Sequence, residues 1–129
     1  YRAGEYNSAV MYATLFLPEL LLIDGYIVLA DGVEQWDDLD GLTARLRDSR
    51  ERALDTQERV NRVEIGYMFG RKSWGCTDLS TIKILGDAIR LAWSAWLALR
   101  FPSIKCDVWL ENAGPDDDWE DLTVTFRQQ

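Results

Sequence analysis

The stretch "LLLIDGYIVL", Leu20 to Leu29, decides the first part of the fold. Two apolar runs flank the dipeptide Asp24-Gly25, which suits the positive φ angles of a two-residue type I′ turn. We therefore expect a β-hairpin with strands near Leu20–Ile23 and Tyr26–Leu29. This hairpin would belong to an N-terminal meander of three strands.

The segment before the hairpin, "AVMYATLFL", predicts the first of these strands near Val10–Leu17, because it is rich in strand-forming residues and Pro18 ends it. From Trp36 to Val60 apolar residues recur at near-helical spacing among dense charges, which indicates an amphipathic surface helix. Three ion pairs are expected at i and i+4 along it: Asp48 with Arg52, Asp55 with Arg59, and Glu58 with Arg62. We interpret the arginine-rich run as a solvated helical face, with a dedicated anion site as the alternative.

The next segment, "RVEIGYMF", alternates in the manner of a half-buried strand and predicts one near Val63–Phe69, ended by Gly70. A long helix over Leu79–Arg100 follows, and Pro102 ends it. One face of this helix carries Ile82, Leu85, Ile89, Trp93, Trp96 and Leu97, and a second apolar face carries Ile84, Ala88, Leu91, Ala95 and Leu99. Such a helix must be covered on more than one side, either by its own domain or by a second subunit in a homodimer.

Two alternating segments complete the chain, "IKCDVWLEN" from Ile104 and "DLTVTFR" from Asp121, and they predict paired strands. The expected fold is a single α+β domain over residues 1–129. Its antiparallel sheet has about six strands in the order βββαβαββ, with the Leu79–Arg100 helix packed on one face.

Composition limits the classes of function. The chain has 129 residues, which suits one domain, and a net charge of −8. Phosphate groups repel carboxylates, so nucleic acid and anionic membranes are disfavoured and a basic protein is the favoured partner. The longest apolar stretch is interrupted by Pro18, Glu19 and Asp24, which argues against a membrane span. We expect a cytoplasmic protein.

The chemistry-bearing residues are few. There are no histidines, which removes the commonest general base and the commonest metal ligand. The two cysteines, Cys76 and Cys106, lack the spacing of a redox motif or a zinc site, and we expect free thiols. "GYMFGRKSWG" lacks the spacing of a phosphate-binding loop. We therefore predict no catalytic residue, no cofactor and no enzyme activity.

The segment "GPDDDWEDLTVTF", from Gly114, places five carboxylates before the last strand: Asp116, Asp117, Asp118, Glu120 and Asp121. Its spacing does not match a calcium loop of the EF-hand type, so we predict no metal. Two interpretations remain, a solvated hairpin loop and an acidic surface that faces a protein partner.

Two of the six tryptophans stand apart from the apolar faces. Trp109 shares its strand face with Lys105, Asp107 and Glu111, and Trp119 lies within the acidic loop. Aromatic side chains surrounded by charge are typical of the centre of a protein interface. The alternative is that the charged helix covers this face of the sheet. We take Trp109, Trp119 and the five loop carboxylates as candidate partner-binding residues.

The combination of "LFLPELLLIDGYIVLA", "LRFPS" after a long helix and a closing "DLTVTFRQ" resembles small acidic uncharacterised bacterial proteins of immunity-protein type. The resemblance is one of layout and transfers no functional residue. It implies a protein that blocks a basic partner, often a toxin domain, by stoichiometric binding. The alternatives are a structural homo-oligomer or accessory protein and, third, a small-ligand binder or enzyme with a pocket between sheet and helix.

Overall fold

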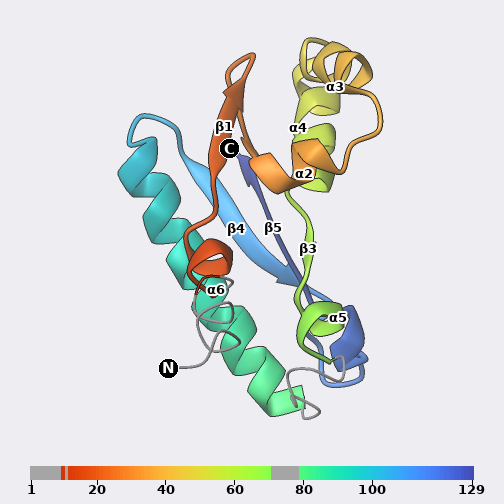
Figure 1. Cartoon of the computed structure of the whole chain (residues 1–129), viewed down its shortest axis with the longest axis vertical. Helices are drawn as coiled ribbons and strands as arrows, with labels where there is room; N and C mark the ends of the chain where they lie inside the picture. Colours follow the sequence, from red (N-terminus) through yellow and green to blue (C-terminus); the bar gives the residue numbers. More distant parts are fainter. Residues whose placement is uncertain (1–9, 11, 71–78) are drawn as a thin grey trace.

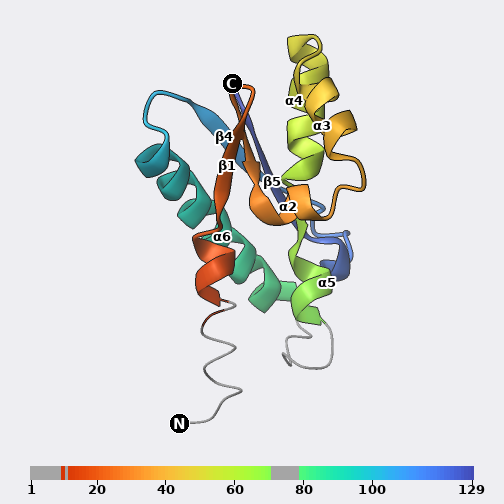
Figure 2. The same ribbon diagram turned by 45° about the horizontal axis from the view of Figure 1, so that its top comes forward.

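The computed structural model describes residue 10, residues 12–70 and residues 79–129. Residue 10 and residues 12–16 are helical. The other elements in chain order are β1 (Leu20–Ile23), β2 (Tyr26–Leu29), α2 (Ala30–Glu34), α3 (Leu39–Leu46), α4 (Arg50–Val60), β3 (Val63–Glu64), α5 (Ile65–Gly70), α6 (Leu79–Arg100), β4 (Cys106–Glu111), the 3₁₀-helix η1 (Trp119–Asp121) and β5 (Thr123–Gln128). Figures 1 and 2 show α6 on one side of the strands and α3 with α4 on the other.

The hairpin is confirmed with its predicted bounds. β1 and β2 pair antiparallel, from Leu20 opposite Leu29 to Ile23 opposite Tyr26. The turn residues have positive φ angles of 50° at Asp24 and 86° at Gly25, as a type I′ turn requires.

The strand predicted near Val10–Leu17 is wrong, because this segment is helical where the structure describes it. Tyr12, Leu15 and Phe16 recur at helical spacing. They pack against the larger of the two hydrophobic clusters, which contains Trp93 and Phe126 and which we call the main core. A short apolar run fits a strand and a buried helix equally well, and its period alone does not separate the two. Pro18 then ends the helix rather than a strand.

The strand predicted near Val63–Phe69 is also largely wrong. Only Val63–Glu64 is extended, and α5 begins at Ile65. The N–H of Gly66 donates to the carbonyl oxygen of Leu122, and a Cβ atom at this position would collide with the carbonyl oxygen of Trp119. The close approach of this backbone to η1, which only glycine allows, replaces the expected strand.

The charged helix predicted from Trp36 onward is divided into α3 and α4. Ser49 separates them, since its side chain accepts a hydrogen bond from the N–H of Arg52 and caps α4. The three predicted ion pairs at i and i+4 are present, at 2.8 Å for Asp48 and Arg52, 3.5 Å for Asp55 and Arg59, and 3.9 Å for Glu58 and Arg62.

The final two strands are confirmed, but the single six-stranded sheet is not. The described residues form five strands in two antiparallel sheets, β1–β2 and β3–β5–β4. In the larger sheet, Val108 of β4 lies opposite Phe126 of β5 and Trp109 lies opposite Thr125.

Three buried amide side chains join the two sheets where a backbone ladder would otherwise run. We call Gln57, Asn61 and Gln128 the amide junction, and their exposed fractions are 0%, 0% and 8%. The N–H of Ile27 in β2 donates to Oε1 of Gln128, and its carbonyl oxygen accepts from Gln57 and Asn61. The N–H of Gln128 donates in turn to Gln57. Side chains from α4, from the residue that follows it and from β5 thus make the bonds that a neighbouring strand would have made.

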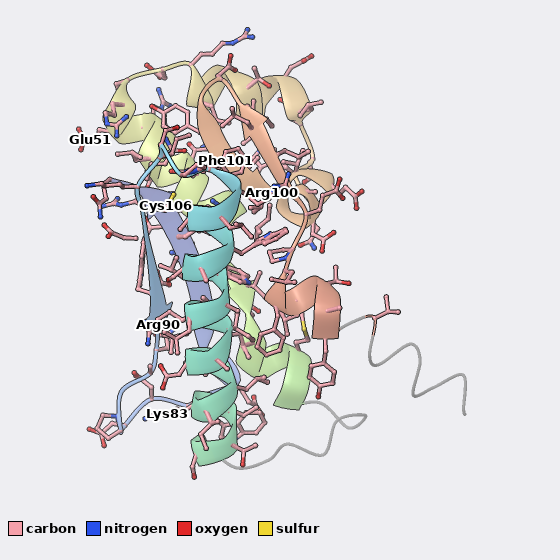
Figure 3. All side chains as sticks on the ribbon, turned by 90° about the vertical axis from the view of Figure 1, so that its left-hand side faces the viewer. Glu51, Lys83, Arg90, Arg100, Phe101 and Cys106 are labelled. Carbon is pink, nitrogen blue, oxygen red and sulfur yellow. The ribbon has the colours of Figure 1, made fainter. Side chains whose placement is uncertain are left out.

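The long helix α6 is present over Leu79–Arg100, where the described residues resume, and its two apolar faces have different environments. Ile82, Ile89, Trp93 and Leu97 are buried in the main core with Val124 and Phe126 of β5. The second face is open among the described residues, with exposed fractions of 71% for Ile84, 60% for Leu91 and 73% for Leu99. Figure 3 shows Lys83 and Arg90 on the side of α6 nearest β4. In the described part of the chain no helix combines the length and apolar character needed to cross a membrane.

Candidate functional site

Two of the five loop carboxylates support the loop itself. Oδ2 of Asp117 accepts a hydrogen bond from the N–H of Gly114 at 2.8 Å. Oδ1 of Asp118 accepts one from the N–H of Glu120 at 3.1 Å and caps η1. Such caps satisfy backbone donors at a turn, so Asp117 and Asp118 have a structural role.

The other three carboxylates, at Asp116, Glu120 and Asp121, have no such role. All three residues are exposed, and their carboxylates make no hydrogen bond or ion pair with the described residues. Like charges at this spacing repel by only about 1 kcal/mol in water, so the arrangement is stable in solvent. These three groups are therefore available to a partner.

Trp119 anchors the acidic loop to the domain. Its side chain is half-buried and packs against the main core. The backbone next to it lies against Gly66 of α5, as described above. The structure therefore places Trp119 between the loop and the core, with part of its ring open to solvent.

Trp109 lies at the margin of the region that α4 covers. The hydroxyl of its neighbour Thr125 in β5 donates to the carbonyl oxygen of Glu58 in α4 at 2.7 Å, so the helix covers β5. Trp109 in the edge strand β4 is only half-buried, and the guanidinium of Arg127 lies 6.0 Å from its ring centre. The charged helix thus covers half of this sheet face and leaves Trp109 accessible at the other half.

Every described arginine is engaged within the molecule. Arg45 and Arg100 lie over the rings of Trp36 and Trp96, and Arg50 donates to the carbonyl oxygen of Gln129. The other six form ion pairs with carboxylates: Arg47 with Asp24, Arg52 with Asp48, Arg59 with Asp55, Arg62 with Glu111, Arg90 with Asp87, and Arg127 with Glu58. The alternative interpretation of the arginine-rich run as an anion site gains no support, because the guanidinium groups of its described arginines already have partners.

Two of these pairs have shifted pKa values. The carboxylate of Glu111 accepts two hydrogen bonds from Arg62 and raises the pKa of that guanidinium. Hydrogen bonds from the N–H of Ser49 and from Arg52 lower the pKa of Asp48. Both shifts favour the charged forms, so these pairs persist across the neutral pH range.

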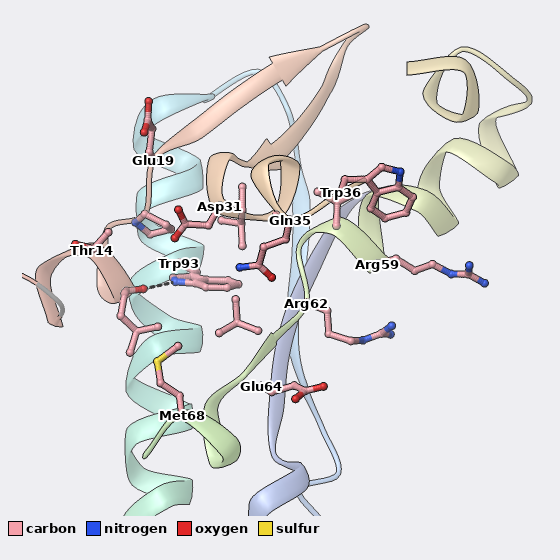
Figure 4. A pocket seen from close by; sticks show the side chains of 16 residues that line it. Thr14, Glu19, Asp31, Gln35, Trp36, Arg59, Arg62, Glu64, Met68 and Trp93 are labelled. Carbon is pink, nitrogen blue, oxygen red and sulfur yellow. Dashed lines mark hydrogen bonds between the residues drawn. The ribbon is translucent and has the colours of Figure 1, made fainter. Parts of the chain in front are cut away.

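A cleft of about 970 Å³ lies beside α6; the third alternative from the sequence included a pocket between sheet and helix, but none of the residues that line this cleft was predicted as a site residue. Its buried lining residues are Leu15, Leu29, Val60 and Trp93. Its walls are half-buried apolar residues, and its rim is charged; the walls are Pro18, Trp36, Val63 and Met68, and the rim is Glu19, Asp31, Arg59, Arg62 and Glu64. Figure 4 shows Trp93 reaching from α6 into the middle of this cleft, where its indole N–H donates to the carbonyl oxygen of Leu15.

Metal and thiol chemistry find little support in the described residues. They contain no group of three or more His, Cys, Asp or Glu side chains that could hold a metal ion. Cys106 is a free, half-buried thiol, and burial raises its pKa to about 11. Such a thiol is protonated at neutral pH and is a poor nucleophile. Cys76 lies outside the described residues.

Comparison with known proteins gives no further guide, since no family model, no curated protein and no solved structure matches this chain.

Proposed function

We propose that this chain is a small acidic protein-binding module of immunity or inhibitor type, which blocks a basic partner protein stoichiometrically and has no catalytic role. One observation carries the proposal. The described arginines are all engaged inside the molecule, whereas the carboxylates of Asp116, Glu120 and Asp121 are exposed and free of partners in the described chain. Of the described lysines, Lys83 and Lys105 form no ion pair, so the unpaired charge of the described residues is predominantly, not exclusively, negative.

The acidic loop and Trp109 would contribute in different ways. Exposed carboxylates accelerate the encounter with a basic protein, because long-range attraction orients the two molecules before contact. Half-buried aromatic side chains act after contact, since removing them from water lengthens the lifetime of the complex. Trp109, beside Arg127 at the open half of the sheet face, is suited to this second role.

The experiment begins with affinity capture from the native organism and identification of the captured protein. Association and dissociation rates are then measured with the purified partner. The loop variant Asp116→Asn/Glu120→Gln/Asp121→Asn should associate several-fold more slowly at low salt, and the difference should shrink at high salt as screening increases. Trp109→Ala should mainly increase the dissociation rate.

A matched control neutralises three other exposed carboxylates, Asp37→Asn/Asp38→Asn/Asp40→Asn, near the start of α3. This control changes the net charge by the same amount, so it isolates the position of the charges from their number. Equal slowing by both triple variants would reduce the proposal to non-specific attraction. A captured partner that is acidic, or that is turned over rather than blocked, would exclude the proposal.

A second candidate function is a structural homo-oligomer, and the open face of α6 favours it. Ile84, Leu91 and Leu99 are each more than half exposed and are separated by Ala88 and Ala95. Alternating large and small side chains on one helix face allow two helices to pack closely. A dimer in light scattering that Leu91→Asp converts to a monomer would support this candidate.

A further inference from the structure

The cleft beside α6 is lined by both basic and acidic residues, but only its acidic residues are without ion-pair partners in the described chain. The rim contains both arginines and acids, but Arg59 is paired with Asp55 at 3.5 Å and Arg62 with Glu111 at 2.9 Å. The carboxylates of Glu19, Asp31 and Glu64 make no hydrogen bond or ion pair with the described residues. The free charge around the cleft is therefore entirely acidic.

The walls of the cleft provide apolar contact below these carboxylates. Pro18, Trp36, Val63 and Met68 are half-buried, and they come from four separate segments of the chain. Lysine and arginine side chains combine an apolar stem with a cationic end. A cleft with apolar walls and an acidic rim is complementary to both parts of such a side chain.

The cleft adjoins a second depression next to the acidic loop. Arg62 and Glu64 line the cleft, and they also line a second, smaller depression that contains Glu120 and Asp121. A chain lying in the cleft would therefore reach the free carboxylates of the loop. The volume of about 970 Å³ can hold several side chains rather than one ion.

We propose that this cleft receives a basic, partly apolar segment of the partner protein. Glu19, Asp31 and Glu64 bind the cationic ends of its lysine or arginine side chains, while Val63, Met68 and Trp36 contact the apolar stems. This inference rests on the proposed function, because the same partner contacts the acidic loop. It adds the location of the main contact and the chemistry of the segment that occupies it.

The test uses three synthetic hexapeptides and the full chain. The first peptide is acetyl-Lys-Leu-Arg-Leu-Lys-Leu-amide, the second replaces each leucine with serine, and the third replaces each basic residue with glutamate. Binding is followed by two-dimensional NMR on ¹⁵N-labelled protein. We expect the first peptide to shift the amide resonances of Val63, Glu64 and Met68 and the indole resonance of Trp93. The serine peptide should bind more weakly and the glutamate peptide should not bind.

Two triple variants with equal charge change locate the binding. The cleft variant is Glu19→Gln/Asp31→Asn/Glu64→Gln, and the loop variant is Asp116→Asn/Glu120→Gln/Asp121→Asn. The cleft variant should weaken binding of the first peptide by about tenfold, as expected for the loss of three screened charge pairs. The loop variant should weaken it by less than about threefold. Both should unfold within about two degrees of the wild type, because these carboxylates have no internal partners in the described chain.

The possible results separate this inference from the proposed function. If the loop variant weakens peptide binding and the cleft variant does not, the cleft is not the site, but the proposal of a basic partner stands. Equal binding of the basic and glutamate peptides would overturn the charge argument for both. Unchanged resonances for all three peptides would overturn the cleft site, and the captured partner would then decide the proposed function on its own.

Discussion

Two regions of this molecule depart from the usual distribution of residue types in opposite directions. The amide junction places Gln57, Asn61 and Gln128 in the interior, whereas the outer face of α6 places Ile84, Leu91 and Leu99 in solvent. In the described residues no buried side-chain nitrogen or oxygen lacks a hydrogen-bond partner. The buried amide side chains are therefore stable in the interior, because each of their polar atoms has a hydrogen-bond partner there. The exposed side chains of Ile84, Leu91 and Leu99, in contrast, are not covered by any part of the described chain.

The two regions differ in whether their side chains have partners within the described chain. The junction is complete within the molecule, so its residues serve the fold. The exposed face of α6 and the free carboxylates of the loop and the cleft have no partners within the described chain, so they are the surfaces that a second molecule would contact. The predictions below test whether each region belongs to the class that we assign to it.

The largest expected effect separates the two faces of α6. Ile89 is fully buried and Leu91, two residues later, is 60% exposed. Ile89→Asp should lower the free energy of unfolding by more than about 3 kcal/mol, because an unpaired charge enters the core. Leu91→Asp should lower it by less than about 1 kcal/mol. Urea unfolding of both variants gives the comparison.

Equal losses in the two variants would contradict the assignment of an open face, and light scattering would then show whether a second subunit covers it. Trp96 is a less suitable probe for a dimer, because its ring is half-buried and its indole N–H donates to the carbonyl oxygen of Pro18 at 2.9 Å.

The next largest effect concerns the amide junction. Asn61→Ala removes the acceptor of the N–H of Leu29 and one donor to the carbonyl oxygen of Ile27. The carbonyl oxygen of Ile27 keeps its bond from Gln57, so of these two groups only the N–H of Leu29 loses its partner. A buried backbone group left without a partner costs about 1–3 kcal/mol, and we expect a loss of about this size. Gln35→Ala, at an exposed amide, serves as the control and should change the stability by less than about 0.5 kcal/mol. A similar small change for Asn61→Ala would show that the junction is not required.

A thiol at the boundary of core and surface gives a pH-dependent test. Burial raises the pKa of Cys106 from 9.0 to about 11, so at pH 8 its thiolate fraction is about one hundredth of that of an unburied thiol. In a Cys76→Ser background, alkylation by iodoacetamide at pH 8 should be slower than in urea by about this factor. The rate should rise tenfold for each pH unit up to about 11. A plateau near pH 9 would place Cys106 in solvent.

The smallest effect, and the one that tests the loop, is the response to calcium. Two of the loop carboxylates cap backbone N–H groups, and the described residues contain no metal-ligating cluster. Thermal unfolding in millimolar calcium and in chelator should therefore give the same midpoint within about one degree, since a ligand stabilises only the state that it binds. A rise of several degrees in calcium would replace the protein-binding interpretation of the loop with a metal site.

The elements that could be predicted from the sequence have local signals. The Asp24-Gly25 turn, the presence and C-terminal end of α6, and the alternating strands β4 and β5 each follow from residues close together in the chain. The strands predicted for residues 10–17 and for residues 65–69 were wrong, because short apolar or alternating runs fit more than one structure. The position of the acidic loop was predicted. Its division into two capping and three free carboxylates was not, because it depends on backbone groups at Gly114 and Glu120.

The features that could not be predicted combine distant residues. The cleft is lined by side chains from Thr14 to Trp93 and has no motif of its own. The amide junction consists of glutamine and asparagine residues that carry no hydrophobic signal, and it divides the strands into two sheets. Apolar patterns identify strands but do not show which strands pair, so the sequence predicted one sheet where the structure has two.

The amide junction also bears on how the chain folds. The hydrogen bond between Ile27 and Gln128 spans 101 residues, and that between Gln57 and Gln128 spans 71. Contacts between such distant residues form late, because the entropy of closing a long loop must be overcome before the bonds are made. The hairpin β1–β2 and the helix α4 depend on local contacts and can form earlier. Before Gln128 is in place, the edge of β2 has backbone groups without protein partners. An incompletely folded chain therefore exposes an unpaired strand edge, and strands of different molecules can aggregate at such an edge.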